Sequence, residues 1–156
     1  MSWWGGFMKR VAIVLCLLSF VSTAWAQTPL FGTWIKRPST TPPMMMVIED
    51  ASPGIKITYR MLGPDGEPEE QNVVTVVTAL DGKEVPMMMD GKPTGQTMAT
   101  LRTGIYVASS VVRLEGKTLR KSTAELSPDG KTLTVDNDMS ASDPGAEKKT
   151  EIWDKK

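Results

Sequence analysis

Apolar and polar positions alternate along most of the chain after residue 30. In the segment Ile55–Met61 every second residue is apolar, and Leu133 and Val135 alternate with Thr134 and Asp136 in the same way. A period of two predicts β-strands that bury one face and leave the other in water. No window of about eleven residues combines the helical period with a capping residue. The pattern therefore predicts an all-β chain.

Turn residues divide these alternating runs into short strands. Short segments with Gly or Pro, such as Asp81-Gly82, Asp90-Gly91 and Pro128-Asp129-Gly130, stand between the runs. Gly supplies the positive φ, and Pro the fixed φ of about −65°, that tight turns need. Together with a short segment around Trp34, we expect about ten strands in an antiparallel up-and-down meander. The other expected strands are Met44–Glu49, Ile55–Met61, Gln71–Leu80, Glu84–Met89, Gln96–Thr103, Ile105–Leu114, Thr118–Leu126, Thr132–Met139 and Thr150–Asp154.

Two of these strands carry an unusual mixture of side chains on one face. Small and large residues mix in Ile105–Leu114, and one face of Thr118–Leu126 is mostly polar, with Arg120 and Ser122. Barrels with an internal cavity accommodate such faces better than tightly filled sandwiches do. The sequence therefore predicts a barrel of about 8–10 strands.

The first 26 residues have the pattern of a secretory signal peptide. Lys9 and Arg10 precede the apolar run Val11–Ser22, and small residues follow at Ala24 and Ala26. We expect cleavage after Ala26, because that arrangement is typical of signal peptidase sites. The apolar run is well short of the roughly 20 residues that a membrane-spanning helix needs. The expected location is periplasmic or secreted, with no stable membrane insertion after cleavage.

The remainder, residues 27–156, has the length of a single domain. Met8 directly precedes Lys9 and is an alternative start of translation. The single cysteine, Cys16, lies within the expected signal peptide, so the domain has no disulfide and depends on a hydrophobic core.

Composition excludes several classes of function. Lys and Arg number 18 against 18 Asp and Glu, so no charge excess favours nucleic acid or anionic lipid. Without histidine there is no Ser-His-Asp catalysis and no imidazole metal site. The acidic groups Asp136–Asp138 and Glu67–Glu70 stand beside turns, where solvated surface charge is the ordinary role, and Ala141 occupies the position where a calcium loop needs glycine. We expect no enzyme activity, no cofactor and no such metal site.

Methionine is the unusual residue type. The chain has eleven, and six lie in the triplets Met44–Met46 and Met87–Met89, each directly after a proline. Because side chains alternate along a strand, Met44 and Met46 share one face, as do Met87 and Met89. Three roles fit these pairs, namely irregular core packing, an adaptable apolar ligand site, and ligation of copper(I) by thioethers.

Several segments together resemble a known group of folds. The run Gly32-Thr33-Trp34, followed by VIEDASPGIKITY, LDGKEVP, SPDGKTLTV and EIWDKK, resembles a family of small exported bacterial proteins of unknown function with a lipocalin-like (calycin) fold. The resemblance implies that Trp34 closes one end of the barrel and packs against a basic side chain from a late strand. Arg113 and Arg120 are the candidates, and Trp153 on the last strand is expected near the first.

The leading hypothesis is a non-enzymatic exported barrel that binds a small apolar or amphipathic molecule. The expected wall residues are Met44, Met46, Met87 and Met89, with Tyr59 contributing a polar tip. One alternative is a periplasmic copper(I) carrier that uses the methionine thioethers. The other is an envelope structural or interaction protein with a filled barrel and no ligand. No protein partner is indicated by the sequence.

Overall fold

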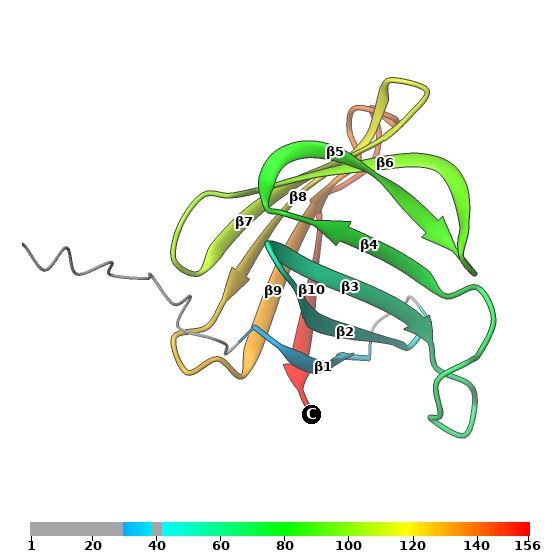
Figure 1. Ribbon diagram of the computed structural model, residues 1–156, viewed down its shortest axis with the longest axis vertical. Helices are drawn as coiled ribbons and strands as arrows, with labels where there is room; N and C mark the ends of the chain where they lie inside the picture. Colours follow the sequence, from blue (N-terminus) through cyan, green and yellow to red (C-terminus); the bar gives the residue numbers. More distant parts are fainter. Residues whose placement is uncertain (1–29, 39–41) are drawn as a thin grey trace, which may run out of the picture.

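The computed structural model describes residues 30–38 and 42–156, and this part of the chain forms ten β-strands and no helix. Each strand pairs antiparallel with its neighbours in sequence, and β1 pairs with β10, so the sheet closes into a barrel (Figure 1). The predicted up-and-down meander is confirmed. The strands are β1 (Gly32–Lys36), β2 (Met44–Ala51), β3 (Gly54–Met61), β4 (Val74–Thr78), β5 (Asp81–Met89), β6 (Lys92–Arg102), β7 (Val107–Leu114), β8 (Lys117–Leu126), β9 (Thr132–Asp138) and β10 (Lys149–Lys155).

One turn lies earlier than the sequence predicts. Asp81-Gly82 was expected to separate two strands, but both residues belong to β5, and the chain reverses at Ala79-Leu80. Leu80 adopts φ 59°, and its amide donates to the Thr78 hydroxyl at 3.1 Å. Gly82, with φ 82°, lies where the pairing of β5 with β6 shifts register. The positive φ of Gly82, which suggested a turn, therefore occurs at a β-bulge.

Buried apolar side chains form two clusters inside the barrel. The larger one lies around Trp34 and Trp153 and includes Met46, and the smaller one consists of Val76, Met87, Met98 and Val112. Trp34 and Val76 are fully buried. Residues 27–156 contain no cysteine, so these clusters supply the main stabilising burial.

The seam between β1 and β10 closes the barrel. Trp34 stands opposite Lys155 in the pairing, and the Lys155 Nζ lies 5.5 Å from the centre of the Trp34 ring. Lys155 is therefore the basic partner of this tryptophan, in place of the expected Arg113 or Arg120. Cross-strand register explains the choice, because it places a β10 side chain directly beside Trp34. Trp153 pairs with Lys36, next to the first strand as expected.

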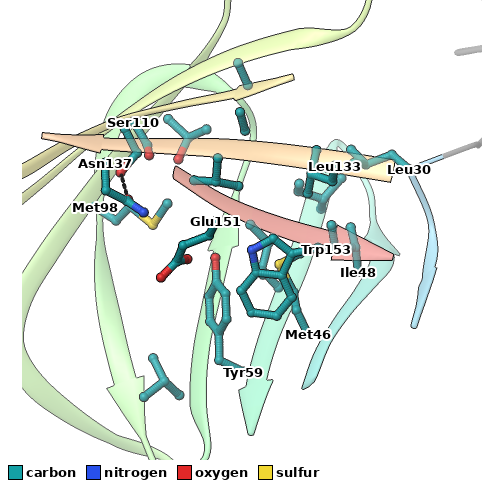
Figure 2. A pocket seen from close by; sticks show the side chains of 18 of the residues that line it. Leu30, Met46, Ile48, Tyr59, Met98, Ser110, Leu133, Asn137, Glu151 and Trp153 are labelled. Atoms are coloured by element: carbon teal, nitrogen blue, oxygen red, sulfur yellow. Dashed lines mark hydrogen bonds between the residues drawn. The ribbon is translucent and has the colours of Figure 1, made fainter. Parts of the chain in front are cut away.

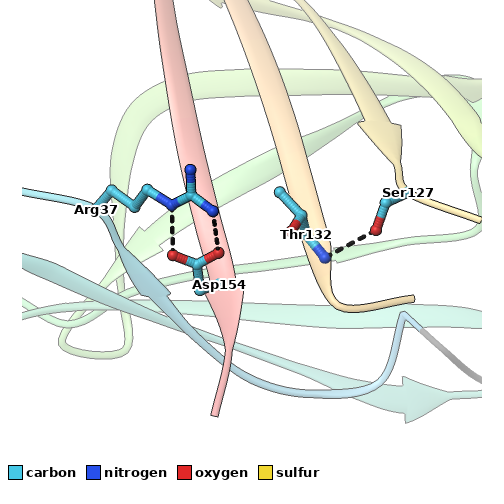
Figure 3. A network of polar contacts seen from close by, with 4 residues as sticks. All are labelled: Arg37, Ser127, Thr132 and Asp154. Carbon is cyan, nitrogen blue, oxygen red and sulfur yellow. Dashed lines mark hydrogen bonds and ion pairs between the residues drawn. The ribbon is translucent and has the colours of Figure 1, made fainter. Parts of the chain in front are cut away.

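A two-point ion pair continues this seam beyond β1. The Arg37 Nε donates to Asp154 Oδ2 at 2.6 Å, and its Nη2 donates to Oδ1 at 2.8 Å (Figure 3). At the turn between β8 and β9, the Thr132 amide donates to the Ser127 hydroxyl at 2.9 Å. The Arg37–Asp154 ion pair and this turn hydrogen bond each fix a chain segment beside the last strands.

The expected signal peptide, its cleavage after Ala26 and the alternative start at Met8 lie outside the described residues. Within the described part of the chain, no helix is long and apolar enough to cross a membrane.

Protonation of Asp154 is expected to weaken the seam. The hydrogen bond from Arg37, assisted by its positive charge, lowers the pKa of Asp154, while slight burial opposes this shift. A carboxyl group whose pKa is lower in the folded state contributes stability above its unfolded pKa and loses that contribution as the pH falls through the folded value. Asp154→Asn should therefore lower the melting temperature at pH 6, and the difference from the wild type should shrink between about pH 4 and pH 2.

Circular dichroism melts across this pH range measure the effect. Lys56→Gln is the control, because the Lys56 Nζ lies 3.5 Å from Glu49 in an exposed pair away from the seam. An Asp154→Asn deficit that is as large at pH 2 as at pH 6 would contradict the assignment.

A divided cavity inside the barrel

The barrel interior contains a partly open cavity of about 300 Å³, at the lower end of the range for small-molecule sites. Closure of the sheet directs alternate residues of β2 to β10 into this one interior space. The lining residues are Leu30, Met44, Met46, Ile48, Ile55, Ile57, Tyr59, Val74, Leu80, Met87, Met98, Thr100, Ala108, Ser110, Arg120, Ser122, Ala124, Leu133, Val135, Asn137, Glu151 and Trp153.

The wall formed by β2 to β5 is apolar apart from one tyrosine hydroxyl. Every lining residue on these strands except Tyr59 is an aliphatic side chain or a methionine. Unbranched methionine side chains adapt to irregular surfaces, so this wall can accommodate apolar groups of varied shape. Besides Tyr59, its members are Met44, Met46, Ile48, Ile55, Ile57, Val74 and Met87.

The wall formed by β6 to β9 contains a row of polar side chains. Thr100 pairs with Ser110, Ser110 with Ser122, and Ser122 with Asn137, so four inward residues stand side by side across four strands. The Ser122 hydroxyl donates to Asn137 Oδ1 at 2.7 Å, and Figure 2 shows this bond beside Met98 and Ser110. We refer to Thr100, Ser110, Ser122 and Asn137 as the polar row.

Charged groups also enter the interior. Lys36 is 4% exposed, and its Nζ lies 2.6 Å from Glu151 Oε1. Figure 2 shows the Glu151 carboxylate and the Tyr59 hydroxyl in the same part of the cavity. Burial raises the pKa of Tyr59, the positive charge of Arg120 opposes that shift, and Glu151 reinforces it. Tyr59 is therefore a neutral phenol near pH 7, and its ring meets that of Trp153 edge-on at 6.4 Å.

Three buried polar atoms have no hydrogen-bond partner among the described residues. They are the Thr100 Oγ1, the Arg120 Nε and the Trp153 Nε1. All three residues line the cavity. Native proteins leave few buried polar groups without a hydrogen-bond partner. The three exceptions here all belong to residues that line one cavity, so the unpaired groups are a feature of that cavity.

A hydrogen bond holds the chain at Leu30, beside the cavity. The Trp34 indole N–H donates to the Leu30 carbonyl at 2.9 Å. Leu30 lies beside Leu133 in Figure 2, and both line the cavity. Trp34 itself is fully buried and does not line the space.

The structure places four of the five expected ligand residues in one cavity wall. Met44, Met46, Met87 and Tyr59 line it, whereas Met89 does not and is 40% exposed. Met89 is the last residue of β5, and the pairing of β5 with β6 shifts register between Pro86 and Met88. Simple alternation therefore does not place Met87 and Met89 together in the wall.

Other cavity residues were not singled out from the sequence as binding residues. Met98 lies outside both methionine triplets. Glu151 lies in a strand in which polar and apolar residues are mixed, so its position alone did not single it out. Arg120 was expected at Trp34, yet it lines the cavity, while Arg113 pairs with Glu84 at 2.6 Å. The polar face of β8 was the signal that could have placed Arg120 inside.

The chain is similar in fold to a protein of known structure. Neither a protein-family model nor a curated protein sequence gives a significant match. Among solved structures, wild-type fluorescent protein UnaG aligns with a TM-score of 0.56 and 13% identity, over 81% of this chain and 96% of UnaG. A point mutant of UnaG, with glutamine in place of one asparagine, aligns with a TM-score of 0.54 and 13% identity, over 80% and 94%. The similarity establishes a calycin-like barrel.

Within the described residues, no group of three or more Asp, Glu, His or Cys side chains is arranged to hold a metal ion. The cavity instead combines an adaptable apolar wall with hydrogen-bonding groups on the facing strands. Such a surface can enclose one small molecule and orient its polar end.

The hydrogen bond within the polar row makes a test of stability possible. Ser122→Ala should lower the free energy of unfolding by about 1–3 kcal/mol, because Asn137 Oδ1 then stays buried without its donor. Ser110→Ala is the matched control, since Ser110 stands opposite Ser122 in the polar row and takes no part in that hydrogen bond. Urea unfolding measures both variants. An equal loss of unfolding free energy in both variants would show that the Ser122–Asn137 hydrogen bond does not contribute to stability as expected.

Proposed function

We propose that this protein is an exported, non-enzymatic barrel that binds a small amphipathic molecule in its interior. The observation that carries the proposal is the division of the cavity into an apolar wall on β2 to β5 and a polar row on β6 to β9. Apolar surroundings favour transfer of an alkyl or aromatic group out of water, and the polar row offers hydrogen bonds for a head group.

Export is supported by the sequence pattern of residues 1–26. Membership of the exported bacterial family is supported by the resemblance of Gly32-Thr33-Trp34 and the later segments to that family. The absence of histidine and of cysteine from residues 27–156 supports a binding role over nucleophilic catalysis. The calycin-like fold adds support at the level of architecture, because such barrels enclose interior space.

The two alternative functions have less support. A filled barrel for structural or interaction roles does not account for a cavity of about 300 Å³ with three unpaired polar atoms around it. For copper(I), the triplet methionines divide between two apolar clusters, with Met46 in one and Met87 in the other, and Met89 lies outside the cavity wall. Neither alternative is proposed further.

Two methionines in one strand provide the test. Met87 lines the cavity and Met89 does not, although they are two residues apart in β5. N-phenyl-1-naphthylamine, a neutral dye that fluoresces in apolar surroundings, should bind the wild type. Met87→Gln should weaken its binding roughly tenfold, because an amide enters the apolar wall, while Met89→Gln should leave it unchanged.

Fluorescence titration gives the affinities, and thermal melts confirm that both variants fold. Native mass spectrometry of protein purified from its own source should also show a bound small molecule. A wild type that neither binds the dye nor carries such a molecule would overturn the proposed function.

A further inference from the structure

The charges inside the barrel do not balance, and the imbalance indicates the chemical class of the ligand. Lys36 and Glu151 form a close ion pair at 2.6 Å. Arg120 lines the same cavity, and it makes no ion pair with any carboxylate among the described residues. A net positive charge therefore remains inside. We propose that the ligand is an anionic amphipath whose acidic group binds Arg120.

The unpaired Arg120 Nε is the first argument for this inference, which rests on the proposed function. That atom is buried and has no hydrogen-bond partner in the described part of the chain. Arg120 as a whole is half-buried, so its Nε is shielded from water while the guanidinium can still be reached by a ligand. Carboxylates, sulfates and phosphates form short charge-assisted hydrogen bonds with guanidinium groups. An acidic head group would supply both the missing charge and the missing acceptor.

The neighbours of Arg120 form the second argument. Arg120 and Ser122 lie two residues apart on the inward face of β8, so Arg120 adjoins the polar row. The Thr100 hydroxyl in that row is also buried and unpaired among the described residues. Hydroxyl groups can donate to the remaining oxygens of a head group bound at Arg120. Tyr59 lines the same cavity, and the positive charge of Arg120 opposes the rise in the Tyr59 pKa that burial causes.

Glu151 is the one carboxylate that the described residues contribute to the cavity lining, and it bears on the sign of the ligand's charge. Its negative charge is already matched by Lys36 at 2.6 Å. A cationic ligand would meet the uncompensated charge of Arg120, and like charges inside a low-dielectric space repel strongly. The interior therefore selects against cations and favours monoanions.

The cavity volume and the apolar wall determine what kind of tail the ligand can have. A cavity of about 300 Å³ equals the liquid volume of roughly ten water molecules. This space suits a single alkyl chain of moderate length or a small ring system. The tail would lie against β2 to β5, on the strands that face the polar row across the barrel.

Four single-chain probes with tails of nine or ten carbons and different head groups test the inference by calorimetric titration below micelle-forming concentrations. Decanoate and decyl sulfate are anionic, decanol is neutral, and decyltrimethylammonium is cationic. At least one anionic probe should bind about 10- to 100-fold more tightly than decanol, as expected for charge-assisted hydrogen bonds. The cation should bind least. Comparison of decanoate with decyl sulfate distinguishes a carboxylate site from a sulfate or phosphate site.

Variants at two arginines test whether the preference for anionic probes depends on Arg120. Arg120→Gln should remove most of the advantage of the anionic probe over decanol, while Arg120→Lys should keep part of it. Arg113→Gln is the matched control, because Arg113 pairs with Glu84 and does not line the cavity. Thermal melts check folding, and if Arg120→Gln does not fold, the head-group preference of the wild type decides the question by itself.

The outcomes separate the two proposals. Equal binding of decanol and both anions would overturn the anionic ligand and leave the binding function standing. An anionic preference that persists in a folded Arg120→Gln variant would overturn the role of Arg120. If none of the four probes and no dye binds, and native mass spectrometry shows no bound molecule, both proposals fail.

Discussion

Closure of the sheet between β1 and β10 is the constraint on which the rest of the structure depends. β1 is only five residues long, yet its pairing with β10 removes the two free edges that an open sheet of this length would expose. The fully buried Trp34 lies at this junction, with its indole bonded to Leu30 and Lys155 over its ring. The same seam that closes the barrel therefore also fixes the chain at Leu30, which lines the cavity.

Closure also explains why polar residues are gathered inside. Once strands form a barrel, every second residue of each strand faces the same interior, and hairpin register decides which of them become neighbours. Register places Thr100, Ser110, Ser122 and Asn137 in one row across four strands. An apolar row would stabilise the fold at least as well, because buried polar atoms contribute little and unpaired ones cost free energy. Retaining them is understandable if they act on a ligand.

Much of the fold could be predicted from sequence, because alternation and turn residues are local signals. All of the expected strands occur, and Trp153 lies beside the first strand as expected. Local signals failed where long-range pairing decides the outcome. Gly82 suggested a turn but lies in a bulge, and Met89 left the cavity wall at the end of a strand with shifted register. Arg120 and Lys155 could not be assigned for the same reason, since the partner of Trp34 depends on how two distant strands align.

The two walls differ in how far they can adapt, and this difference bears on ligand choice. Met44, Met46 and Met87 have several rotatable bonds, so the apolar wall can follow tails of different shape at little cost. Two polar groups on the other side of the cavity are held in place, because Ser122 on β8 is bonded to Asn137, and Glu151 on β10 is paired with Lys36. Fixed polar groups discriminate strongly, since a ligand that fails to match them leaves buried groups unpaired. For the amphipathic ligand proposed above, selectivity should therefore reside in the head group, with tolerance for the tail, and this proposal would account for a methionine-rich wall and a polar row in one barrel.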